Sequence, residues 1–149
     1  MRPSWILNSG GVNFPDTKTD SQVRPIGKPA LGLLQAIANR DADWVFPAER
    51  GDGHYVGLPK VLIRICTRAK LPRTTPQGLR HTFASIAGDL GFSELTIDAL
   101  LGHGKSGAGG YVHLDLVLVA AADRVASVIA AALDGKPEAE VIPLRDVTG

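Results

Sequence analysis

Between residues 75 and 133 the sequence carries signals that start and stop three successive helices. Thr75-Pro76 supplies a hydroxyl cap followed by proline at the first helical position, and apolar residues recur at helical spacing as far as Leu90. A short helix is expected at 93–102, from a serine cap to a glycine stop, and a long amphipathic helix at 115–133. Because caps and stops define where helices begin and end, these signals predict a helical second half.

The first half of the chain is expected to combine short strands with two further helices. Apolar and polar residues alternate at 6–26 around central turn residues, so paired strands are expected there. Helices are expected at 29–38 and from about residue 59, and Trp44-Val45-Phe46 should form a short buried strand between them. We therefore predict an α+β fold, mainly α, with a small antiparallel β-sheet or hairpin on one side.

Composition limits the kind of protein that this chain can be. Its 149 residues are 44% hydrophobic and 21% charged, as is usual for a single globular domain. The single cysteine, Cys66, excludes an internal disulfide framework and is expected to be a core residue. Apolar runs such as 116–122 are short and broken, so no membrane span is expected, and the N-terminus lacks a signal peptide. We expect a cytoplasmic protein.

Positive charge is concentrated in the middle of the chain, although the net charge is only +1. No Asp or Glu occurs between Gly53 and Gly88, and this stretch holds six Lys or Arg residues. Within it Lys60, Arg64 and Arg68 are spaced by four, so they share one face of a helix. Such a basic stretch is typical of a surface that binds phosphate groups, and it is also compatible with a solvated face whose acids lie elsewhere.

A possible anion site lies in the first turn of the helix that starts at Thr75-Pro76. Gln77 and Arg80 are three residues apart near this helix N-terminus, where backbone N–H groups also favour an anion. Arg80 could hold a phosphate through two parallel hydrogen bonds, or it could be an ordinary surface arginine. His81 is assigned a structural role, and the scattered histidines have no metal-ligand spacing, so no metal site is expected.

Three short motifs follow one another in the second half of the chain: TPQGLRHTFAS at 75–85, LLGH at 100–103 and YVH at 111–113. Upstream of them, TKT at 17–19 is followed by VRPI at 23–26 and WVFP at 44–47. In this order the segments resemble the catalytic domain of phage-integrase-type tyrosine recombinases, over about residues 8–133. The upstream segments are similar to that family's hairpin, which carries a catalytic lysine, and to the strand that follows it.

The resemblance implies catalytic roles for five residues. Tyr111 would attack the scissile phosphodiester and form a 3′-phosphotyrosyl link, while Lys18 gives a proton to the departing 5′-oxygen. Arg80 and His103 would bind the oxygens of that phosphate and stabilise the charge of the transition state. Gln77 stands where the family usually has histidine, and it can hydrogen-bond a phosphate without accepting the tyrosine proton. No metal ion or other cofactor is required, because arginine and lysine supply the positive charge.

The resemblance also implies partners and a biological setting. The function would be site-specific DNA recombination, the integration or excision of a phage or other mobile element in a bacterial cytoplasm. The partners would be double-stranded DNA and further copies of the chain, a tetramer in the family's synapse, with no membrane and no small-molecule substrate. The DNA-binding residues would be Lys60, Arg64, Arg68, Arg73 and Thr75.

The expected organisation is a partial catalytic domain over residues 1–135 and a C-terminal tail over 136–149. The family's first catalytic arginine lies upstream of the hairpin and has no counterpart near Arg2, so a truncated domain is expected, with weak or no activity as an isolated chain. One alternative is a catalytically inactive DNA-binding or assembly fragment of a recombinase. Another is a helical protein-interaction domain that docks a partner through 115–149.

Overall fold

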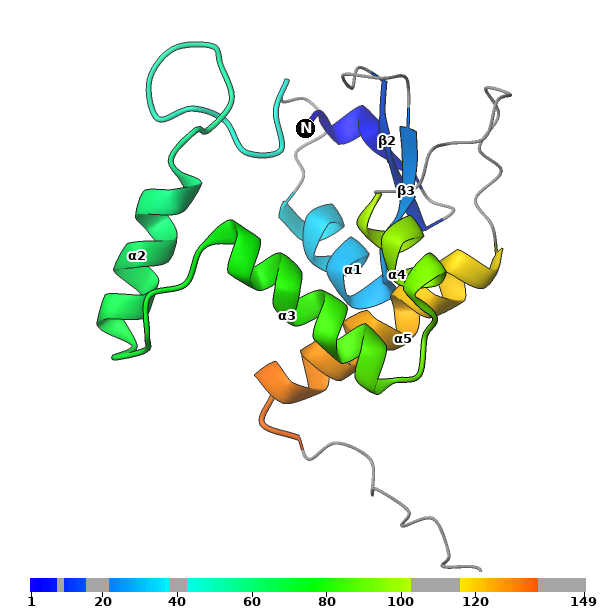
Figure 1. The fold of residues 1–149 in the computed structure, drawn as a ribbon. Coiled ribbons are helices and arrows are strands. Elements are labelled where there is room, and N and C mark those ends of the chain that lie inside the picture. The colour runs from blue at the N-terminus through cyan, green and yellow to red at the C-terminus, as the bar shows by residue number, and fades with distance from the viewer. Residues whose placement is uncertain (8–9, 16–21, 38–42, 103–115, 137–149) are drawn as a thin grey trace, which may run out of the picture.

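The computed structural model describes residues 1–7, 10–15, 22–37, 43–102 and 116–136. These residues form a mainly helical α+β fold with five α-helices and a three-stranded antiparallel sheet near the N-terminus, which confirms the predicted fold class (Figure 1). The helices are α1 (Lys28–Ile37), α2 (Leu58–Arg68), α3 (Pro76–Asp89), α4 (Glu94–Leu101) and α5 (Leu116–Leu133). The predicted tail lies outside the described residues, except for its first residue.

The sheet follows a short 3₁₀-helix, η1 (Pro3–Trp5), and contains β1 (Ile6–Leu7), β2 (Gly11–Phe14) and β3 (Gln22–Pro25) in the order β1-β2-β3. The paired strands predicted at 6–26 are thus confirmed. Val12 of β2 is fully buried and lies opposite Arg24 of β3. Because directly opposite residues project to the same face of a sheet, this register directs Arg24 toward the interior side.

Capping residues place α3 and α4 where their sequences predict. The Thr75 hydroxyl accepts a hydrogen bond from the Gly78 backbone N–H at 3.0 Å, with Pro76 as the first helical residue. The Ser93 hydroxyl accepts one from Thr96 N–H at 3.2 Å, and Gly102 ends α4 with a φ of 71°. The start of α3 and the end of α4, which carry two of the three motifs, are therefore set by local chemistry.

The core lies where α5 packs against α1, α3 and α4. Leu100, Ala121 and Ala122 are buried together, with Phe83 and Leu118 packed around them. Gly27, between β3 and α1, touches α5 so closely that a Cβ would overlap the Cβ of Ala126. The buried Cys66 of α2 confirms its predicted core position.

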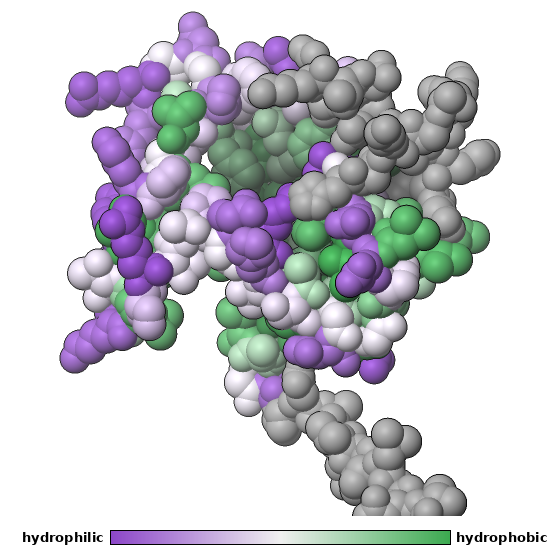
Figure 2. Space-filling model, viewed as in Figure 1, coloured by the Kyte–Doolittle hydropathy of each residue, from purple (hydrophilic) through white to green (hydrophobic). Residues whose placement is uncertain are grey.

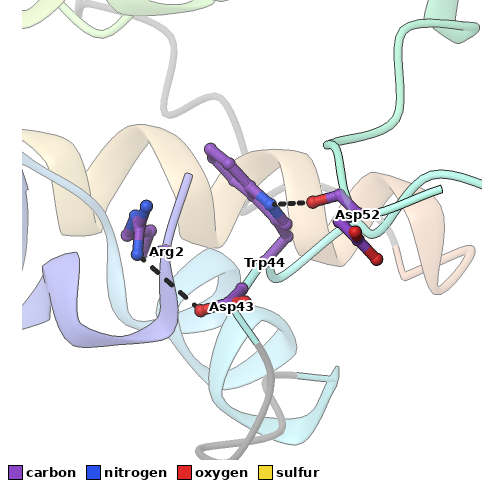
Figure 3. A network of polar contacts seen from close by, with 4 residues as sticks. All are labelled: Arg2, Asp43, Trp44 and Asp52. Carbon is purple, nitrogen blue, oxygen red and sulfur yellow. Dashed lines mark hydrogen bonds and ion pairs between the residues drawn. The ribbon is translucent and has the colours of Figure 1, made fainter.

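The predicted buried strand at Trp44-Val45-Phe46 is wrong. Among the described residues this segment forms no strand: Val45 is buried, but Phe46 is 49% exposed. Its polar groups are bound by the N-terminus and a loop instead, since Val45 N–H donates to Met1 O at 3.1 Å and Trp44 Nε1 to Asp52 O at 3.1 Å (Figure 3). Three strand-favouring residues do not form a strand without a neighbouring strand to pair with.

Helix α5 corrects the expectation that no segment could span a membrane. Its 18 residues have a mean hydropathy of 2.0, so by length and composition it could cross a bilayer, although core helices of soluble proteins pass the same test. Asp123, at which the apolar run breaks off, accepts a hydrogen bond from Lys28 N–H at 2.6 Å and lies 3.4 Å from Lys28 Nζ. This polar contact joins α5 to the start of α1.

Candidate functional site

Arg80 connects two of the three sequence motifs. It follows the capped first turn of α3, and its half-buried side chain reaches the end of α4. There Nη2 donates a hydrogen bond of 2.6 Å to the backbone carbonyl of Leu101. The arginine of the first motif therefore contacts the LLGH motif directly, next to its Gly102-His103 pair.

Arg24 reaches the same carbonyl from the sheet. Its Nη1 donates to Leu101 O at 3.2 Å, and its guanidinium carbon lies 5.8 Å from the centre of the Phe14 ring. The guanidinium also rests on Gly102, where a Cβ would overlap its Cζ. Sequence reasoning missed Arg24 as a site residue, because only the β2–β3 register shows that it is directed inward.

A groove of about 410 Å³ opens beside the two arginines. Arg24, Arg80, Phe83 and Leu101 line it together with apolar residues of α1 and α5. Its polar groups thus include two cationic side chains beside an otherwise apolar wall. Such an arrangement favours a ligand with a negatively charged group.

Gln77 is exposed on α3 and does not belong to the lining of this groove. Its Nε2 lies 3.5 Å from Nε2 of His81, one helical turn further along. His81 is also exposed. Gln77 and Arg80 both lie near the start of α3, but their side chains have different partners. Gln77 contacts His81, whereas Arg80 donates a hydrogen bond to Leu101 O.

Three of the predicted catalytic residues, Lys18, His103 and Tyr111, lie outside the described residues. Arg2, the arginine nearest the N-terminus, lies beside Asp43 at 3.8 Å and over the ring of Trp44 at 5.1 Å (Figure 3). It is not part of the groove that Arg24 and Arg80 line. Among the described predicted catalytic residues, the groove therefore includes Arg80 alone.

The predicted DNA-binding residues lie on and beside α2. Lys60, Arg64 and Arg68 are all exposed, and we call the surface that they share the basic face of α2. Figure 2 shows hydrophilic side chains gathered along this helix, at the left of the view. Arg73 is exposed in the segment that leads to α3, whereas the Thr75 hydroxyl is engaged as the α3 cap.

The described residues include no group of three or more His, Cys, Asp or Glu side chains that could hold a metal ion. What the site offers chemically is a pair of guanidinium groups at the end of α4, with a basic helix on the far side of α3 (Figure 1). Comparison of the chain with protein-family models, with curated protein sequences and with solved structures finds no match.

Proposed function

We propose that this chain is part of the catalytic domain of a tyrosine recombinase, with a helical catalytic lobe and a small β-sheet. Its chemistry would be cleavage and rejoining of double-stranded DNA for site-specific integration or excision of a mobile element. The observation that carries the proposal is the 2.6 Å hydrogen bond from Arg80 to Leu101 O, across 21 residues of sequence. Through it, the helix that bears the first motif meets the second motif at Leu101, two residues before His103.

The proposed reaction balances without an external energy source. The Tyr111 hydroxyl loses its proton to water and its oxygen forms a bond to phosphorus, while the bond from phosphorus to the 5′-oxygen breaks and that oxygen takes a proton from Lys18. In the second step a 5′-hydroxyl of another strand gives its proton back to Lys18 and attacks the 3′-phosphotyrosyl link, and the released tyrosine oxygen takes a proton from water. Arg80 and His103 stabilise the charge that develops on the phosphate oxygens, which is the type of contribution that usually dominates such steps.

The basic face of α2 supports DNA as the partner. Three cations on one exposed helix face attract a phosphate backbone without reading its sequence. Self-association on DNA in a bacterial cytoplasm belongs to the same proposal. This face would be equally useful in a fragment that binds DNA without chemistry, so the test must separate binding from cleavage.

Covalent trapping tests the proposal. The full chain is incubated with nicked duplexes that lose a short 5′-hydroxyl fragment on cleavage, drawn from a library of candidate sites, and protein–DNA adducts are detected by mass. We expect a low yield of adduct, because Gln77 cannot accept the tyrosine proton, and we expect none with Tyr111→Phe. Salt-dependent DNA binding without an adduct would favour the inactive DNA-binding fragment. Absence of both would favour a protein-interaction domain.

A further inference from the structure

We propose that Lys70, directly after α2, contacts a DNA phosphate and is retained at a strained backbone position for its charge. The inference rests on the proposed function, because it takes duplex DNA as the ligand. It goes beyond that function by adding a binding residue to the three cations of the basic face of α2. The observation that carries it is a φ of 54° at Lys70, the only positive φ outside glycine among the described residues.

Helix α2 ends in a Schellman turn, in which the residue after the helix cap adopts a left-handed conformation. Lys70 N–H donates to Thr67 O at 3.2 Å, and Leu71 N–H donates to Cys66 O at 2.9 Å. These two bonds satisfy carbonyl groups at the end of the helix and fix Lys70 at the left-handed position. A residue with a Cβ is unfavourable there, because the Cβ approaches the carbonyl oxygen that follows it.

The ends of α3 and α5 show which residue this turn favours. The same pair of hydrogen bonds is formed after α3 by Gly91 and Phe92, and after α5 by Gly135 and Lys136. Gly91 and Gly135 have φ values of 82° and 67°, so glycine occupies the left-handed position in both turns. Lys70 is the exception among the three turns, and glycine would relieve its strain. A residue that costs stability at its own position is a candidate for a functional role.

No polar contact among the described residues offsets this strain. Lys70 is exposed, and its ammonium has neither a hydrogen bond nor an ion pair with any of them. A cation near the C-terminus of a helix interacts favourably with the helix macrodipole, but Arg68 already occupies the last turn of α2. The charge of Lys70 is therefore better explained by a ligand than by the stability of the helix.

The surroundings of Lys70 favour a polyanion as this ligand. Arg68 precedes it and Arg73 follows it, and both are exposed, so three cationic side chains lie within six residues of sequence. No acidic residue occurs between Gly53 and Gly88, so none lies nearby in sequence to neutralise them. The basic face of α2 ends at Arg68, so a phosphate backbone that follows this face meets Lys70 at the end of the helix.

The test separates stability from DNA binding in the full chain. Lys70→Gly removes the strain together with the charge, so we expect the melting temperature to rise by about 2 °C. Binding of a fluorescent duplex DNA, measured by anisotropy over a range of NaCl concentrations, should weaken about fivefold in the same variant. The slope of log K against log[NaCl] should fall by about one, as expected for one lost phosphate contact. Higher stability with weaker binding is the result expected of a strained binding residue.

Three further variants control for charge and for strain. Lys70→Arg keeps the charge at the strained position, so the salt slope should equal that of the parent chain. Gly91→Lys places lysine at the same position of the α3 turn, where a Cβ meets open space, and should lower the melting temperature by about 2 °C. Arg124→Gln, at an exposed arginine of α5, removes a charge elsewhere and should bind DNA as the parent chain does.

Each contrary result has a defined meaning. If Lys70→Gly is more stable but keeps the salt slope, Lys70 contacts no phosphate, and the inference is overturned while the proposed function stands. If Lys70→Gly is less stable than the parent chain, Lys70 serves the end of α2 instead, and the inference is likewise overturned. A slope that depends on Lys70 without any adduct at Tyr111 would support the DNA contact and contradict only the proposed cleavage. A parent chain that binds no DNA overturns both.

Discussion

Helix α2 and the junction of β3 with α4 both carry positive charge, but they hold it in different ways. On α2, Lys60, Arg64 and Arg68 are exposed, and the helix packs against α3 near the edge of the molecule (Figure 1). At the junction, Arg24 and Arg80 are half-buried and share the Leu101 carbonyl. One region presents charge on long, solvated side chains, and the other fixes it through packing.

Under the proposed function, the difference gives the two regions separate tasks. Exposed charges attract a polyanion from a distance and are screened by salt, so they contribute affinity and association rate rather than position. Half-buried, anchored guanidinium groups bind at a defined place and lose less entropy in doing so. Substitutions in and around the junction should therefore change stability and DNA binding, whereas substitutions on α2 should change DNA binding alone.

The largest effect on stability is expected at Gly27, where the backbone lies directly against α5. Gly27→Ala places a Cβ against Ala126, and neither the turn nor α5 can yield without shifting the core, so we expect the free energy of unfolding to fall by about 3 kcal/mol. Urea denaturation measures it. The control is Gly32→Ala in α1, where no atom lies within 4 Å and alanine should be neutral or stabilising. Equal effects at both positions would contradict a tight β3–α1–α5 contact.

The next largest effect on stability is expected at Gly102, in the junction of β3 with α4. Gly102→Ala combines the strain of a positive φ with an overlap against Arg24, so we expect a loss of about 2 kcal/mol in the free energy of unfolding. Gly91→Ala is the matched control, because Gly91 also has a positive φ but faces open space. Only Gly102→Ala should also lower the salt slope of DNA binding. If the two variants behave alike, Arg24 does not depend on Gly102.

A smaller effect is expected at the cap of α3. Thr75→Ala removes the acceptor for Gly78 N–H and should cost about 1 kcal/mol in thermal or chemical unfolding. Thr75→Ser keeps a hydroxyl at the same position and should retain most of the stability. A Thr75→Ala variant as stable as Thr75→Ser would mean that the cap does not define the start of the helix that carries Arg80.

The smallest effect on stability is expected on α2. The triple variant Lys60→Gln, Arg64→Gln, Arg68→Gln should change the free energy of unfolding by no more than about 0.5 kcal/mol, because all three side chains are exposed. In the same variant the slope of log K against log[NaCl] for duplex DNA should fall by about two to three. An unchanged slope would remove α2 from the DNA-binding surface. Arg124→Gln again serves as the control.

Helix boundaries could be predicted well where a short-range signal exists. The caps at Thr75 and Ser93 and the stop at Gly102 act within three or four residues, so they can be recognised in any fold that contains them. The prediction failed at Trp44-Val45-Phe46, where strand propensity needs a partner strand that the described structure does not provide. The long helix predicted at 115–133 is confirmed as α5, and only the expectation that no segment is apolar enough to span a membrane was wrong.

The helices, their caps, the buried position of Cys66 and the basic face of α2 could all be predicted from the order of residues, because each depends on positions a few residues apart. The meeting of Arg24, Arg80 and Leu101 could not be predicted in this way, because it depends on how distant segments pack. Arg24 lies 77 residues from Leu101, and no local preference encodes a contact of that range. It arises because the strand register directs Arg24 inward and because Gly102 lacks the side chain that would exclude it.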